Sequence, residues 1–580
     1  MSPATTFSIN EQTRARALTV MRSEELDILV VGGGIVGTGA ALDAATRGLS
    51  VGLVEARDFA SGTSGLSSKL VHGGIRYLEQ LNFHLVREAL IERGLLLQQI
   101  APHLVTPIRF LFPVTHHVWE RAYIGAGMFA YDGLSYLGGR LPGVPHHRHL
   151  SKRQVQLASP GLADDATVGG MSYWDGHVDD ARYTATLART AAHYGAHVAT
   201  RAFVQEFLRD GDSVVGVRVR DNMTGDTFEV RAKQVVVATG VWTDHLQDLI
   251  GDPETFAVRM SKGVHIVVEK SKFRSLMGLL LRTEKSVLFV IPWGRFWIIG
   301  TTDTPWDLSP AHPVATQADI DYILNRVNAV LAEPITREDV VGVYAGLRPL
   351  LAGDTDDTAK LSREHVVANP APGVTVVAGG KWTTYRVMAQ DAIDAAVAHL
   401  PASVRDSVPA SVTKDISLLG ADGYQAAVNR HAEYATRTGL SGYQITRLLG
   451  RYGTDIDLIV EMIEADRGLA ATLPGTKDYR EAEVVFAARH EMAIHLDDVL
   501  MRRTRLIFES RDRAIQAAER TADLMATELG WDAQRRAREV ADYTARATAE
   551  LAAELTTNDH EAEAAWNQVA EVSLGKDGFS

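Results

Sequence analysis

The chain has 580 residues, of which 46% are hydrophobic and 23% are charged, and its formal net charge is −13. This length predicts two to four domains of about 100–200 residues each. An acidic chain of ordinary globular composition is a poor general binder of nucleic acid, so we expect no nucleic-acid partner. The absence of cysteine excludes disulfides, iron–sulfur clusters, thiol catalysis and cysteinyl flavin links within this chain.

No apolar run reaches the roughly 18–20 residues of a membrane-spanning helix. Residues 1–24 lack the uninterrupted apolar core of a signal peptide. We therefore expect a polar N-terminal leader at 1–24 and a cytoplasmic protein whose contact with a membrane is peripheral.

The first structured segment is a predicted βαβ unit. Residues 28–31 form a β-branched run, a glycine-rich turn and an alanine-rich helix follow, and 51–54 form a second strand. Alternating apolar and polar residues over 258–302 predict an antiparallel sheet. Beyond 401–409 the chain is helical and rich in Ala, Arg and Glu.

The predicted fold class is therefore α/β. We expect a Rossmann-like dinucleotide-binding domain interleaved with an antiparallel-sheet substrate domain, followed by a C-terminal all-α domain. The predicted boundaries are 25–105 with 165–260 and 340–400 for the first domain, 106–164 with 261–339 for the second, 401–412 for a linker, 413–540 for the helical domain and 541–580 for a helical tail.

The turn carries a dinucleotide fingerprint. Gly32, Gly34 and Gly37 form the G-x-G-x-x-G pattern, in which the glycines permit the turn, the approach of pyrophosphate and close helix–strand packing. The helix N-terminus favours an anion. Glu55 ends the next strand, where an acid accepts hydrogen bonds from ribose hydroxyls and repels the extra phosphate of NADP. A tight turn without a ligand is the alternative, and the glycines leave NAD and FAD both open.

A series of motifs in fixed order identifies a family resemblance. The motifs are DILVVGGGIVGTGAALDAATRGLSVGLVEA, SGTSGLSSKLVHGGIRYLE, WDGHVDDAR, VVVATGVW, SKGVHIVV, VIPWGRFWIIGTTDTPW, YAGLRPL and GGKWTTYR. With them, residues 27–386 resemble the FAD-dependent glycerol-3-phosphate dehydrogenases, which belong to the D-amino-acid-oxidase-like flavoproteins, and ARHEMAIHLDDVLMRRTRL is similar to their C-terminal domain. The resemblance implies non-covalent FAD, oxidation of sn-glycerol 3-phosphate to dihydroxyacetone phosphate, and electron delivery to membrane quinone.

The same motifs imply which residues bind the cofactor. They include the glycine turn, the serine-rich loop that follows Glu55, and the glycine-bearing ends of two later strands. The first domain is thereby predicted to be an FAD-binding domain. The predicted FAD-binding residues are Gly32, Gly34, Ile35, Val36, Gly37, Glu55, Thr63, Ser64, Ser67, Ser68, Lys69, Val204, Thr239, Gly240, Trp242, Gly380, Lys381, Thr383 and Thr384.

Oxidising a secondary alcohol removes a hydride and a proton, so the pocket needs a base beside the flavin and cations for the substrate phosphate. His72, before Gly73, is our candidate base, because an unperturbed imidazole titrates near pH 6.5. A structural role for His72 in orienting its loop is the alternative.

The predicted phosphate ligands are Arg76 and Arg348, because a guanidinium binds phosphate in bidentate fashion. Lys381 suits the developing alkoxide or the reduced flavin, and Tyr77 suits substrate positioning. Surface ion pairs or packing are the alternatives for these four. We also place Lys262 and His265 near the substrate. His72, Arg348 and Lys381 form the predicted catalytic set.

The reduced flavin needs an electron acceptor from outside the chain, which is quinone, oxygen or a dye. Aromatic and apolar residues over 119–142, with Arg140, Arg148, Lys152 and Arg153 beside them, suit a bilayer interface. We therefore predict peripheral docking on the inner face of the plasma membrane, with an ordinary core or dimer surface as the alternative. The apolar set is Trp119, Tyr123, Ile124, Met128, Phe129, Tyr131, Leu134, Tyr136 and Leu137.

Three other functions remain open at this point. A glycerol-3-phosphate oxidase would pass electrons to oxygen, an amino-acid oxidase of the same wider group would bind a carboxylate, and a scaffold flavoprotein would bind without turnover. No H-E-x-x-H or comparable spacing favours a metal, so we assign none. We expect a homodimer.

Overall fold

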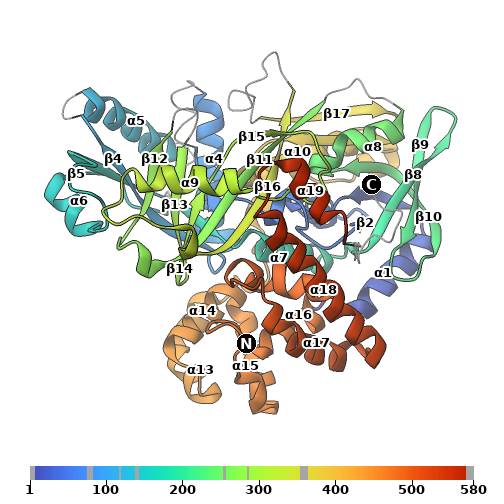
Figure 1. Ribbon diagram of the computed structural model, residues 1–580. Coiled ribbons are helices and arrows are strands. Elements are labelled where there is room, and N and C mark those ends of the chain that lie inside the picture. Colours follow the sequence, from blue (N-terminus) through green and yellow to red (C-terminus); the bar gives the residue numbers. More distant parts are fainter. Residues whose placement is uncertain are drawn as a thin grey trace.

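The computed structural model describes residues 7–74, 82–116, 119–136, 143–251, 257–283, 287–352 and 364–569. Figure 1 shows two sheets side by side and a set of C-terminal helices, coloured orange to red, packed beneath them. The predicted α/β fold class with a C-terminal helical region is confirmed.

The first sheet is parallel at its centre. β1 (Leu26–Val31) lies between β2 (Val51–Val54) and β10 (Thr227–Val237) and pairs in parallel with both. These strands are almost continuously apolar because helices or a second layer cover both faces. The strand order is β17 (His365–Ala371), β18 (Val374–Gly379), β10, β1, β2 and β7 (His197–Ala199), with β8 (Ala202–Asp210) and β9 (Ser213–Asp221) forming a hairpin beside the first half of β10.

Two layers enclose this sheet. Helices α2 (Ile35–Thr46), α7 (Asp180–His193) and α10 (Tyr385–Ala398) share one hydrophobic core with one face of it. The hairpin, α8 (Thr243–Ile250) and α1 (Glu11–Ser23) cover the other face. The prediction of a leader at 1–24 is therefore wrong for its described part: α1 buries Leu18 and Met21, and its Arg14 pairs with Asp221 at 2.6 Å.

The second sheet is largely antiparallel. α4 (Phe83–Leu95) and α5 (Trp119–Tyr136) pack on one face, whereas α6 (Lys152–Ala158) and α9 (Gln317–Asn328) pack on the other. The strand order is β15 (Thr304–Trp306), β11 (Val258–Glu269), β14 (Phe296–Gly300), β13 (Val287–Trp293), β12 (Gly278–Arg282), β4 (Val105–Val114), β6 (Gly169–Val178) and β3 (Leu70–Val71), with β16 (Val340–Leu351) paired to β11 and β5 (Arg148–Ser151) to β6.

The structure differs from the predicted boundaries at this sheet. β6 and β16 fall in the segments assigned to the first domain, yet they pair with β4 and β11 of the second sheet. The reason is that an apolar run marks a buried strand without stating which strand it pairs with. The two domains are nevertheless interleaved. The chain enters the second sheet at β3, returns to the first sheet for β7 to β10, and adds its last strand to the second sheet at β16.

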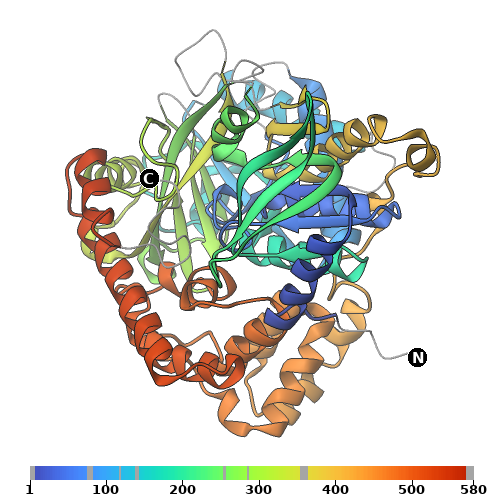
Figure 2. The same cartoon turned by 90° about the vertical axis from the view of Figure 1, so that its right-hand side faces the viewer.

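Most of the C-terminal helices, from residue 424 to residue 553, share a core of their own. Val404 packs instead against the core of the first sheet, and Ala562 joins a small separate cluster. The expected border between helical domain and tail at 540 lies inside α18, so that boundary is wrong. Figure 2 shows α18 and α19 running up one edge of the molecule toward the second sheet. The helices are α11 (Ala402–Arg405), α12 (Tyr424–Asn429), α13 (His431–Thr438), α14 (Gly442–Tyr452), α15 (Ile456–Ala465), α16 (Glu481–His490), α17 (Ile515–Leu529), α18 (Ala533–Ala553) and α19 (Asp559–Trp566).

Candidate active site

The glycine turn between β1 and α2 has the predicted geometry. Gly32 has φ of +113°, and a Cβ atom on it would lie 2.6 Å from the carbonyl oxygen of Ala238. A Cβ atom on Gly37 would lie 1.9 Å from the carbonyl oxygen of Gly32. Both positions accept only glycine, because any side chain would force the turn away from the strand or the helix.

Glu55 follows β2 and is tied to this turn. Its Oε2 accepts a hydrogen bond from the backbone N–H of Gly33 at 2.6 Å, and its Oε1 accepts one from Arg57 N–H at 2.7 Å. Burial raises the pKa of Glu55, and these two bonds oppose that effect. The carboxylate thus lies at the C-terminal edge of the parallel strands, where a ribose is bound in folds of this kind.

A deep cleft opens at the same edge. It holds about 1300 Å³ of empty volume, including the solvent at its mouth, and runs from the glycine turn past the end of β10 to the end of β18. The predicted cofactor residues that line it are Gly32, Gly34, Ile35, Val36, Glu55, Thr63, Ser64, Ser67, Val204, Thr239, Gly240, Trp242, Gly380 and Lys381.

Several buried polar atoms face this region without a protein partner. Thr63 Oγ1, Thr239 Oγ1, Trp242 Nε1 and Trp382 Nε1 find no hydrogen-bond partner among the residues that the structure describes. A buried polar group left in this way costs free energy unless a ligand satisfies it. A large cofactor with many donors and acceptors fits this set of atoms.

The N-terminus of α2 is a ready anion site. Gly34 is the N-cap and supplies no side-chain hydrogen bond, while Ser64 Oγ accepts from the backbone N–H of Ile35 at 2.9 Å. The first-turn amides and the helix dipole favour a diphosphate here.

The remaining predicted cofactor residues lie behind the cleft. Gly37 serves packing, and Thr384 is buried. Thr383 Oγ1 accepts from the backbone N–H of His72 at 3.1 Å and donates to its carbonyl at 3.3 Å, so it fixes the backbone of the candidate base. The Lys69 side chain turns away to Asp180 at 2.8 Å and is not available to a ligand in the cleft.

Arg348 lies on β16 beside the cleft, and the next residue, Pro349, lines it. Its guanidinium donates to Ser261 Oγ at 3.3 Å and to Thr301 Oγ1 at 3.1 Å. The carboxylate of Asp303 is 3.6 Å away. These contacts hold Arg348 in place while its side chain keeps 23% exposure, as a phosphate ligand requires.

His265 lies on β11 in the same region. Its ring stacks on Tyr344 at 4.7 Å, and its Nε2 is 2.9 Å from Ser68 Oγ. Burial holds the pKa of His265 well below its ordinary value, and the charges of Arg348 and Lys69 act in the same direction. The buried surroundings of His265 therefore favour its neutral form.

The prediction that Lys262 binds substrate is wrong. Lys262 and His265 are three positions apart on one strand, so their side chains point to opposite faces. The ammonium of Lys262 pairs with Asp319 at 2.7 Å and with Asp559 of α19. Arg76 and Tyr77, the other predicted substrate residues, lie outside the described residues.

Sequence reasoning missed several residues that line the cleft. Gly62 and Trp382 lie inside two of the motifs that carry the family resemblance, so the sequence held a signal for them. Arg57, Phe203 and Met388 gave none, because only the approach of distant segments brings them to the cleft.

The parallel sheet, the glycine turn with its acid and the cleft define a dinucleotide-binding protein, and its match to known families identifies it as an FAD-dependent oxidoreductase. The family model of FAD-dependent oxidoreductases matches residues 27–386, and that of the C-terminal domain of alpha-glycerophosphate oxidase matches 411–536. The protein of Mycobacterium tuberculosis called glycerol-3-phosphate dehydrogenase 2 is 54% identical over 546 residues, which cover 94% of this chain and 92% of that protein.

More distant relatives agree. The human mitochondrial glycerol-3-phosphate dehydrogenase is 37% identical over 541 residues, which cover 89% of this chain and 72% of that protein. The crystal structure of the glycerol-3-phosphate dehydrogenase from Bacillus halodurans complexed with FAD has a TM-score of 0.74 at 29% identity, covering 92% of this chain and 96% of that one. The chain belongs to the family of FAD-dependent glycerol-3-phosphate dehydrogenases.

Proposed function

We propose that this chain oxidises sn-glycerol 3-phosphate to dihydroxyacetone phosphate with bound FAD. The observation that carries the proposal is the position of Arg348, a held but partly exposed guanidinium one residue from the wall of the cofactor cleft. The names of the relatives support the same substrate. A cation beside a flavin cleft suits a small phosphorylated alcohol.

FAD, when bound, supplies the hydride acceptor. Arg348 binds the substrate phosphate, and Lys381 at the end of the cleft stabilises negative charge on the reacting oxygen. His72 takes the hydroxyl proton, and Thr383 holds its backbone in place. His265 is buried beside Ser68, and its lowered pKa disfavours a further positive charge there.

The test is an anaerobic titration of the purified holoenzyme. Glycerol 3-phosphate bleaches the flavin absorbance, while glycerol and glycine at equal concentration leave it unchanged. Bleaching by glycine would instead favour an amino-acid oxidase, and persistent colour with all three would favour a scaffold flavoprotein.

We propose membrane quinone as the physiological acceptor. The chain contains no cysteine for a cluster or dithiol relay, so the electrons pass directly to a diffusing molecule. Oxygen is the second candidate, because the C-terminal region matches the model of an oxidase domain. Reoxidation by a soluble quinone analogue and by air, with peroxide measured in both, separates the two.

The surface of α5 supports peripheral docking on the inner leaflet. Trp119, Tyr123 and Phe129 are exposed by 59%, 52% and 75%, and Arg148 is exposed nearby. The prediction is wrong for Ile124, Met128 and Tyr131, which were grouped with them but are buried. Among the helices that the structure describes, none has the length and hydropathy to cross a bilayer.

Vesicle flotation tests this docking. Glutamate at Trp119, Tyr123 and Phe129 together should abolish flotation with anionic vesicles, whereas Tyr443→Glu, an equally exposed aromatic site on α14, should not. Equal flotation of all three proteins would refute docking through α5. The expected homodimer is tested separately by sedimentation equilibrium.

A further inference from the structure

A buried carboxylate lies directly behind the cofactor cleft. Asp180, the first residue of α7, accepts hydrogen bonds at its Oδ2 from the Ser67 backbone N–H at 2.9 Å and from Ser67 Oγ at 2.7 Å. The ammonium of Lys69 lies 2.8 Å from Oδ1, and Arg505 pairs with the same oxygen. Asp180 has no exposed surface.

The two cations hold a second point on the same loop. Lys69 Nζ and Arg505 Nη1 donate to the carbonyl oxygen of Gly65 at 2.8 and 2.9 Å. Lys69 and Arg505 both have positive φ, at +60° and +75°. Non-glycine residues keep this conformation only where the surroundings impose it. The charges thus hold the backbone of 62–69 in one arrangement.

The front of this loop lines the cofactor cleft through Thr63, Ser64 and Ser67. Its far end reaches the substrate side, where Tyr344 donates to the carbonyl oxygen of Ser67 at 3.1 Å and stacks on His265. A displacement of the loop would therefore change both the cofactor contacts and the setting of His265.

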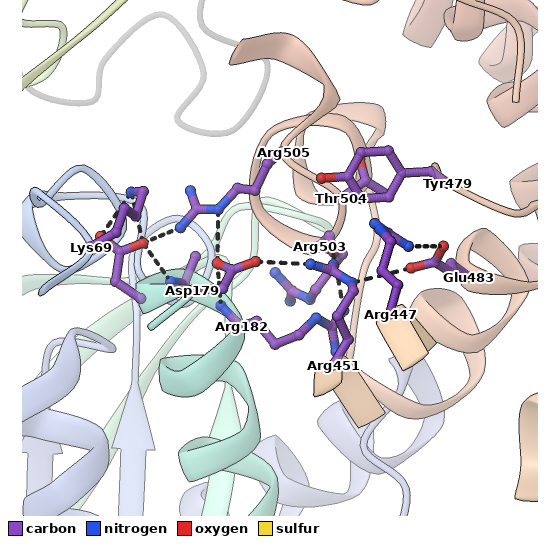
Figure 3. Close-up of polar contacts among 12 residues, drawn as sticks. Lys69, Asp179, Arg182, Arg447, Arg451, Tyr479, Glu483, Arg503, Thr504 and Arg505 are labelled. Atoms are coloured by element: carbon purple, nitrogen blue, oxygen red, sulfur yellow. Dashed lines mark hydrogen bonds and ion pairs between the residues drawn. The ribbon is translucent and has the colours of Figure 1, made fainter. Parts of the chain in front are cut away.

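Arg505 comes from the C-terminal domain, not from either sheet. Its neighbour Arg503 binds Asp58 at 2.8 and 2.9 Å, and Arg502 binds the same carboxylate. Asp58 stands just before the loop and is fully buried. Figure 3 shows the part of this network that runs from Lys69 through Arg505 and then Asp179 to Arg451 and Glu483. The C-terminal arginines thus contact this part of the chain at two points, at Asp58 before the loop and at Gly65 within it.

We propose that Asp180 and Arg505 are positioning residues for FAD, so that the C-terminal domain completes the cofactor site from behind. Buried ion pairs add little net stability over apolar packing, but they impose geometry, and loss of one partner leaves an uncompensated buried charge. The proposal rests on the assignment of the cleft made above.

The test uses full-length holoenzyme with three exchanges. Arg505→Gln and Asp180→Asn should each raise the FAD dissociation constant at least about tenfold, since each removes charged hydrogen bonds to the loop. They should also shift the visible absorbance of the flavin that remains bound. Arg505→Lys should restore part of the affinity, because it keeps the charge but cannot bridge Asp180 and Gly65 as a fork.

Arg182→Lys is the matched control. Arg182 is as buried as Arg505, and its bonds go to Glu491 and to the carbonyl oxygen of Arg503, not to the loop. It should lower the melting temperature and leave the FAD dissociation constant within about twofold.

Wild-type FAD affinity in Arg505→Gln and Asp180→Asn, or an equal loss in Arg182→Lys, would overturn the proposal. If Arg505→Gln does not fold, Arg505→Lys decides by the same comparison. Wild-type protein that binds FAD but is not reduced by glycerol 3-phosphate would refute the proposed function alone, and the binding comparison would still apply.

Discussion

The Oε2 atom of Glu55 lies 2.6 Å from the backbone nitrogen of Gly33, so the end of β2 is bonded to the glycine turn that follows β1. This contact brings the acid and the anion-binding helix N-terminus to one edge of the parallel sheet. The glycine turn and Glu55 are therefore held together as one structural unit.

Glu55→Gln should weaken FAD binding about tenfold or more, because an amide is a poorer acceptor than a carboxylate for ribose hydroxyls. Fluorescence of the released flavin gives the dissociation constant. Asp27→Asn, at the opposite end of β1, is the control and should leave the constant unchanged. Equal affinity of both variants would show that Glu55 does not bind the cofactor.

Gly37→Ala should destabilise the protein by about 3 kcal/mol or more, since its Cβ would overlap the carbonyl oxygen of Gly32. Gly127→Ala on α5 has nothing within 4 Å of the new Cβ, and it should be neutral or stabilise by up to about 1 kcal/mol. Denaturant unfolding of both variants measures the difference, and similar curves would contradict the close packing at Gly37.

Arg348→Ala should lower kcat/KM for glycerol 3-phosphate, because a charged ligand of the phosphate is lost. The corresponding loss of transition-state stabilisation should be roughly 2–4 kcal/mol. The kcat/KM of Arg348→Lys should lie between that of Arg348→Ala and that of the wild type. Arg259→Ala, an exposed site on the neighbouring strand, is the control. An unchanged kcat/KM in Arg348→Ala would remove the assignment.

His72→Asn should lower kcat more than it raises KM, and it should flatten the acidic side of the kcat/KM–pH profile, because the proton acceptor is lost. FAD affinity should stay near that of the wild type, since Thr383 holds the backbone of His72. A retained acidic limb would assign His72 the structural role instead.

Glu509 should make stability fall as pH rises. Burial raises the pKa of Glu509 to about 7, although hydrogen bonds donated by Trp293 and Tyr479 act to lower it. The folded pKa lies above the unfolded value, so the cost of ionising Glu509 is absent at low pH and grows between about 4.5 and 7. Glu509→Gln should therefore gain about 1–3 kcal/mol relative to wild type between pH 4.5 and pH 8, as urea unfolding at both pH values would reveal.

Local sequence patterns were enough to predict much of the fold and the glycine turn, acid and serine loop of the cofactor cleft. The turn at Gly32 and Gly37, the strand end at Glu55 and the serine loop at Ser64 are each set by neighbours within the chain, and the structure brings them to one cleft as the motifs implied. Side-chain parity would also have separated Lys262 from His265, had the strand been treated as continuous.

The residues alone predict the βαβ fingerprint, the order of the motifs and the helical character of the C-terminus, because these follow from short-range periodicity and backbone sterics. Only the folded chain shows that β6 and β16 join the second sheet, that Lys262 pairs with Asp559 and that Arg505 reaches the loop behind the cofactor cleft. These contacts join residues far apart in the chain, and their partners are chosen by packing and by the pairing of buried charges.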